Sequence, residues 1–115
     1  MTPLETLKAA RDLISDPARW TKVRLAKDAN NKTVNVYDPN AFCFCAMGAL
    51  LSVSKLEASH WVIAQASDAL NSNLPAEFIR AYNHEYCSFT DFNDTHTHAE
   101  VLALFDAAIA ELEGV

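Results

Sequence analysis

The sequence predicts a mainly α domain of the α+β class, with about five helices in a compact bundle and one β-hairpin near residues 20–37. Helix-start signals recur along the chain, and two alternating segments rich in β-branched residues flank a polar turn. Half of the 115 residues are apolar, and only two are glycines. We therefore expect residues 1–115 to form a single domain that buries its own core.

The first helix begins after Thr2. Pro3 falls at the first helical position, and Glu5, three residues after Thr2, completes a capping box. Asp16-Pro17 predicts the end of this segment, because the residue before a proline avoids the helical region.

A β-hairpin is predicted next. Apolar and basic residues alternate over residues 20–27, residues 28–31 form a polar turn, and residues 33–37 alternate again with β-branched side chains.

The following segment predicts a buried helix. Asp38-Pro39 fits a helix N-cap followed by proline, and residues 40–52 are apolar on nearly every side. Gly48 lies inside this helix, where glycine lowers helix stability, so we expect another backbone to approach closely there.

Three further helices complete the prediction. Ser54 and Glu57 form a capping box for a helix that fades near residue 71, and Pro75 begins the next helix. The buried stripe of that helix is expected to comprise Phe78, Ile79 and Tyr82.

A polar-aromatic loop is expected over residues 89–95. Thr97 and Glu100 then make a third capping box for the last helix, which Gly114 closes.

The charge pattern narrows the function classes. Nine Lys/Arg and fifteen Asp/Glu give a net charge of −6, which argues against a protein that binds nucleic acid through its phosphates. The basic residues are dispersed, with only Lys22, Arg24 and Lys27 close together. The apolar run 41–51 is too short to span a bilayer, and no signal peptide is evident. With an odd number of cysteines, these features predict a cytoplasmic protein with reduced thiols.

Cys45 is the leading candidate for catalysis. Its thiol, or that of Cys43, would act as a nucleophile with His96, His98 or His60 as the base, oriented by Asp94 or Asn93. The alternative is that both thiols are small buried apolar side chains. A metal site combining Cys43 and Cys45 with His96 and His98 is disfavoured, because zinc-binding cysteines are usually separated by two or more residues. We expect no metal and no cofactor.

The loop before the last helix is the most polar segment of the chain. Asn93, Asp94 and His96 are candidate binding residues, and the alternative is that they only cap and order the loop. Tyr82 and Tyr86 are weaker candidates for a partner-binding patch.

Several motifs together resemble a family of small bacterial and bacteriophage proteins known only as a domain of unknown function. They are Trp20 ahead of Ala26-Lys27-Asp28, the segment Cys45-Ala46-Met47-Gly48-Ala49-Leu50, the pair Asn93-Asp94, and Thr97-His98-Ala99-Glu100-Val101-Leu102. Phe92 stands where the family usually has tryptophan. The resemblance implies a bacterial or phage cytoplasmic protein, marks Cys45 as the family's thiol, and implies no activity.

Two functional hypotheses remain open. The favoured one is a small acidic protein-interaction module, such as a phage accessory protein that inhibits or modulates a host protein. The alternative is a small-ligand-binding protein or enzyme that uses Cys45 with the Asn93-Asp94 loop. The first predicts a protein partner, with a homo-oligomer also open, and neither nucleic-acid nor membrane binding. A helix-turn-helix regulator ranks last, because the expected recognition helix, residues 54–71, carries Lys55 as its only basic residue besides His60.

Overall fold

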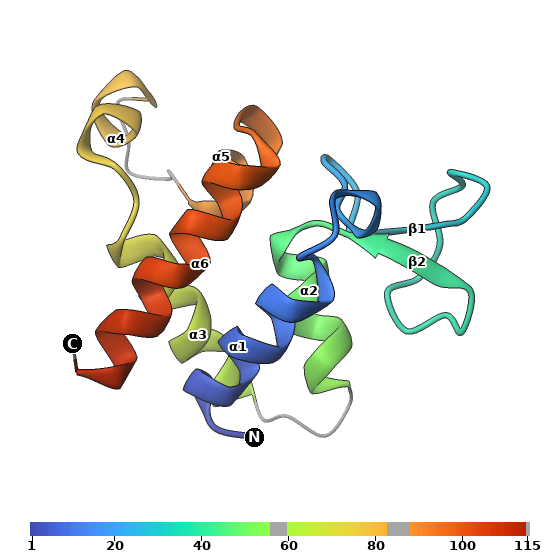
Figure 1. Ribbon diagram of the computed structural model, residues 1–115, viewed down its shortest axis with the longest axis horizontal. Coiled ribbons are helices and arrows are strands. Elements are labelled where there is room, and N and C mark those ends of the chain that lie inside the picture. Colours follow the sequence, from blue (N-terminus) through green and yellow to red (C-terminus); the bar gives the residue numbers. More distant parts are fainter. Residues whose placement is uncertain (56–59, 83–87, 115) are drawn as a thin grey trace.

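The computed structural model describes residues 1–55, 60–82 and 88–114, and it confirms a mainly α fold with a small antiparallel sheet (Figure 1). The elements in chain order are α1 (Pro3–Leu13), a 3₁₀ turn (Pro17–Arg19), β1 (Ala26–Asp28), β2 (Ala41–Phe44), α2 (Ala46–Ser54), α3 (His60–Ser72), α4 (Ala76–Tyr82), α5 (Phe89–Thr95) and α6 (His98–Glu113).

The core lies among four of these helices. Helix α1 packs against α2, α3 and α6, and α3 packs against α6. The two strands lie at one side of the molecule and α4 at the other (Figure 1). Large side chains that are almost fully buried come from several elements, among them Leu7, Leu50, Leu70, Phe89 and Phe105.

The structure confirms two of the predicted capping boxes and the final cap. Thr2 with Glu5 and Thr97 with Glu100 each exchange both hydrogen bonds that define the motif. Gly114 adopts the left-handed conformation at φ 78° and closes α6 as predicted.

The second strand of the hairpin differs from the prediction. Strand β1 pairs with residues 41–44, in the register Ala26–Phe44 and Lys27–Cys43, and residues 33–37 contribute only an isolated bridge from Thr33 to Lys27. The carboxylate of Asp28 accepts from the amides of residues 30 and 32, so the chain turns tightly here and then takes a longer path back.

The buried helix also begins later than predicted. Asp38 does not cap a helix, because its Oδ1 accepts from the amide of Asn40 in a local turn. The N-cap of α2 is Cys45, whose Sγ accepts from the amide of Gly48 at 3.4 Å. The segment 41–44 is a strand because pairing with β1 places Phe44 in the core.

Three smaller expectations are corrected. Ser54 ends α2 and its hydroxyl donates to the carbonyl of Leu50, while Glu57, its expected capping partner, lies outside the described residues. Residues 89–95, expected as a loop, form α5. In α4, Phe78 is buried as expected but Ile79 is 40% exposed.

Candidate functional site

Asn93 is a buried amide that joins three separate parts of the chain. It lies on α5 with only 1% of its surface exposed. Its Oδ1 accepts from Trp20 Nε1 at 2.7 Å and from the amide of Ala46 at 3.1 Å. Its Nδ2 donates to the carbonyl of Thr21 and to Asp94 Oδ1, each at 3.1 Å. The side chain therefore uses both of its polar atoms twice, leaving little capacity for a ligand.

Asp94 links this hydrogen-bond network to Val23, whose backbone is strained. Its Oδ1 also accepts from the amide of Val23 at 2.8 Å. Val23 has φ 74°, in the left-handed region that β-branched residues avoid. Such a conformation costs about 1–3 kcal/mol and persists only where surrounding contacts hold it. Asp94 supplies one of those contacts.

The N-terminus of α2 also contacts the segment that contains Val23. The amide of Cys45 donates to the carbonyl of Leu25 at 3.3 Å. A Cβ added at Gly48 would lie 1.9 Å from that carbonyl oxygen. The close backbone approach predicted for Gly48 is therefore confirmed, and its partner is the segment before β1.

We call residues 21–25 the presented loop, because Asp94 and the N-terminus of α2 bond to its backbone while the side chains of residues 22–25 are exposed. Val23 is 66% exposed and Leu25 is 44% exposed. Lys22 and Arg24 alternate with them and are also exposed, and the Lys22 ammonium lies 5.5 Å from the Trp20 ring centroid. The loop thus exposes two apolar and two cationic side chains on a backbone that is hydrogen-bonded to Asp94 and Cys45.

The Cys45 thiol occupies a structural position. The residue is 8% exposed, and burial raises the pKa of the thiol, an effect that the hydrogen bond from the Gly48 amide partly opposes. In the described part of the chain, no hydrogen bond joins this thiol to a histidine. Cys45 and Asp94 both bond to the backbone of the presented loop. The Cys45 amide donates to the Leu25 carbonyl, and the Asp94 carboxylate accepts from the Val23 amide, so the two residues are not arranged as a nucleophile and its orienting group.

The two histidines before and within α6 point to different places. His96 stacks on Phe92 at 3.8 Å between ring centroids, with Nδ1 3.1 Å from that residue's carbonyl oxygen. His98 donates from Nε2 to the carbonyl of Ile14 at 2.6 Å and lies against Trp20. Over the ranges that the structure describes, no three His, Cys, Asp or Glu side chains gather as metal ligands. Tyr86 lies outside these ranges, and of Tyr82 only its place at the end of α4 is described.

Cys45 is expected to resist thiol reagents in the native state at pH 8. Its labelling rate should follow the unfolding rate, measured by mass spectrometry of each cysteine separately. A raised thiol pKa stabilises the fold fully below the unfolded value of about 8.5, and this contribution is lost as pH rises through the folded value. The denaturation midpoint should therefore fall less between pH 8 and 10 in Cys45→Ser than in Cys43→Ser. Rapid native labelling of Cys45 would contradict the assignment.

Charge is distributed unevenly along the sequence, contrary to the expectation that the basic residues are dispersed. Residues 17–55 contain six Lys/Arg and two Asp/Glu, whereas residues 56–115 contain one Lys/Arg and ten Asp/Glu. Counting charge by segment rather than over the whole chain would have found it. We call the cationic part the basic lobe, and its cations are Arg19, Lys22, Arg24, Lys27, Lys32 and Lys55.

Comparison with known proteins places the chain in a family whose function is not known. The model of a family of unknown function (DUF6197) matches residues 1–111, so the chain belongs to this family. No curated protein and no solved structure matches the chain significantly. In residues 1–55, 60–82 and 88–114, no helix combines the length and apolar character needed to cross a membrane.

Proposed function

We propose that this member of the DUF6197 family is a small protein-interaction module whose contact surface is the presented loop. One observation carries the proposal: the amide of Val23, a strained and exposed β-branched residue, is bonded to Asp94, which is tied in turn to the buried Asn93. Backbone strain of this kind gathers at functional positions, because stability alone does not favour it. A pre-organised apolar side chain also loses little entropy on binding.

The chemistry of the loop indicates the partner. Lys22 and Arg24 flank Val23, and residues 17–55 carry four further cations, although the whole chain is acidic. We propose an acidic protein surface with a shallow apolar recess for Val23 or Leu25. Charge complementarity would steer the encounter, and the apolar contact would supply most of the affinity.

The biological setting follows from the family resemblance of the motifs. We propose a bacterial or bacteriophage protein that acts in the cytoplasm by inhibiting or modulating a host protein. The motifs that carry the resemblance support this, because Trp20, Cys45, Gly48, Asn93 and Asp94 all help to hold the presented loop or its base.

An enzyme or small-ligand binder built on Cys45 and the Asn93-Asp94 loop is the less supported alternative. The Cys45 thiol is buried with a raised pKa, and both polar atoms of Asn93 are occupied by the protein itself. The measurements on Cys45 described above test this alternative directly.

Charge reversal on the loop tests the proposal. The chain is immobilised and proteins retained from a bacterial host extract are identified by mass spectrometry, with native chain and the double variant Lys22→Glu/Arg24→Glu in parallel. We expect one or more acidic proteins that the native chain retains and the variant loses, with retention that falls as salt is raised.

The matched control is Lys8→Glu/Arg80→Glu, which changes the net charge equally at positions outside the loop. This control should retain the same proteins as the native chain, and Val23→Asp should lose them as the charge reversal does. Equal retention by native chain and both loop variants would refute the loop as the contact surface.

A further inference from the structure

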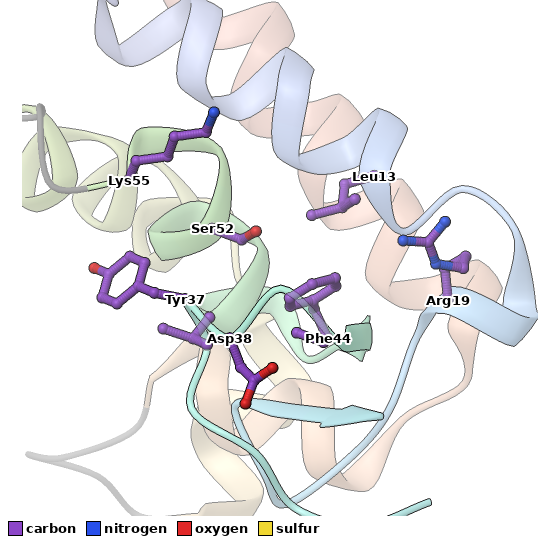
Figure 2. A pocket seen from close by; sticks show the side chains of 9 residues that line it. Leu13, Arg19, Tyr37, Asp38, Phe44, Ser52 and Lys55 are labelled. Atoms are coloured by element: carbon purple, nitrogen blue, oxygen red, sulfur yellow. The ribbon is translucent and has the colours of Figure 1, made fainter. Parts of the chain in front are cut away.

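A second surface feature, separate from the presented loop, is a groove between the end of α1, the 3₁₀ turn, the start of β2 and the end of α2 (Figure 2). Its volume is about 470 Å³, within the range typical of small-molecule sites. The apolar side chains that line it are Leu13, Val36, Ala41 and Phe44. Its polar lining comprises Arg19, Tyr37, Asp38, Ser52 and Lys55.

Arg19 is held in place at one end of the groove. Its Nε donates to the carbonyl of Phe42, and its guanidinium carbon lies 4.7 Å from the centroid of the Phe42 ring. These contacts fix the side chain and leave its two terminal amino groups available. Figure 2 shows the guanidinium beside Leu13. Within the described ranges, Arg19 forms no ion pair with a carboxylate.

Further donors lie along the same groove. Lys55 follows α2 directly, and Ser52 lies one turn earlier on the helix (Figure 2). Tyr37 places its hydroxyl below Lys55 in this view. In the part of the chain that the structure describes, no hydrogen bond or ion pair is formed by the Lys55 ammonium or by the hydroxyls of Ser52 and Tyr37.

Asp38 is the single carboxylate among the lining residues. Its Oδ1 already accepts from the amide of Asn40. Figure 2 shows this carboxylate at the opposite end of the view from the Lys55 ammonium. Figure 2 places Lys55 and Arg19 on opposite sides of the groove, so an anion is favoured beside either cation and disfavoured beside Asp38.

We propose that this groove binds an organic carboxylate with a flat apolar body. Arg19, whose planar guanidinium suits carboxylates, would bind the anionic group, and Lys55 on the opposite side of the groove would add to the positive potential there. The apolar body would cover Leu13 and Phe44. An apolar lining with a few uncommitted polar groups is the usual composition of a small-ligand site.

Titration with 2-naphthoate, followed by calorimetry and by NMR chemical shifts, tests the proposal. We expect one molecule bound per chain, with shifts confined to groove residues. Arg19→Met should weaken binding about tenfold, because it removes the charge-assisted contact, and Lys55→Met should weaken it less, because its charge lies on the opposite side of the groove. Lys32→Met makes the same charge change outside the groove and should leave binding unchanged.

Matched ligands measure separately the contributions of the carboxylate and of the apolar body to binding. Naphthalene-2-carboxamide should bind about tenfold more weakly than 2-naphthoate, because it lacks the charge. Inorganic phosphate should fail to displace 2-naphthoate at equal concentration. Binding unaffected by both groove variants, or weakened equally by Lys32→Met, would overturn the proposal, as would displacement by phosphate. Circular dichroism of each variant verifies its fold. The groove uses no residue of the presented loop, so this result and the partner experiment are independent.

Discussion

Replacing Asn93 by alanine is expected to lower the free energy of unfolding by about 3 kcal/mol or more. The substitution would leave the Trp20 indole N–H and the Ala46 amide without their acceptor, and the Thr21 carbonyl without its donor. Each buried polar group that loses its partner costs about 1–3 kcal/mol. Trp20 fluorescence should also change in the native state, because its indole N–H bonds directly to Asn93.

Urea denaturation at pH 7 measures this effect, and Asn71→Ala is the matched control. In the described part of the chain, the side chain of Asn71 accepts one hydrogen bond, from the amide of Phe89 at 2.8 Å, so its loss should cost about 1 kcal/mol. Equal destabilisation by the two substitutions would contradict the role assigned to Asn93 as the centre of the network.

The second large effect is expected from Gly48→Ala, which should destabilise the fold by about 2 kcal/mol or more. Glycine to alanine within a helix ordinarily stabilises it by about 1 kcal/mol. Here the new Cβ would lie 1.9 Å from the carbonyl oxygen of Leu25, a backbone atom that moves only if the presented loop moves. The sign of the change is therefore reversed by tertiary structure.

Gly114→Ala provides the comparison for Gly48. A Cβ at Gly114 meets nothing within 4 Å, and only its φ of 78° opposes the substitution. A loss of about 1–2 kcal/mol, the cost of left-handed backbone for an L-residue, is the expected result. A stabilising Gly48→Ala, measured by urea denaturation, would show that the loop does not rest on α2 as described.

Local signals in the sequence predicted the helix ends well. The capping boxes at Thr2 and Thr97 depend on residues three apart, so every interacting group is visible in a short window. Glycine at position 114 is equally local. The mainly α fold follows from such signals together with apolar periodicity.

The errors lie where tertiary contacts decided between helix and strand. The apolar run 41–51 fits a buried helix or a buried strand equally well, and pairing with β1 made its first part a strand. Residues 89–95 were too polar to suggest a helix, yet α5 buries Phe89, Phe92 and Asn93 on one side.

The contacts of the candidate site could not be predicted from local sequence either. Asn93 and Asp94 were predicted as candidates from their polar setting, with loop-ordering as the alternative, and the structure gives them contacts of that second kind. Their partners Trp20 and Val23 are more than 70 residues away in sequence. Nothing local to either segment indicates that they meet, or that Val23 has a positive φ.

The uneven distribution of charge determines the electrostatic potential that an approaching macromolecule meets. The Debye length is about 8 Å at physiological salt, whereas the molecule measures 36 × 29 × 24 Å. An approaching macromolecule therefore senses the nearest patch rather than the net charge of −6. At physiological salt, a neighbour that approaches the basic lobe therefore meets a locally cationic surface on a protein whose net charge is negative.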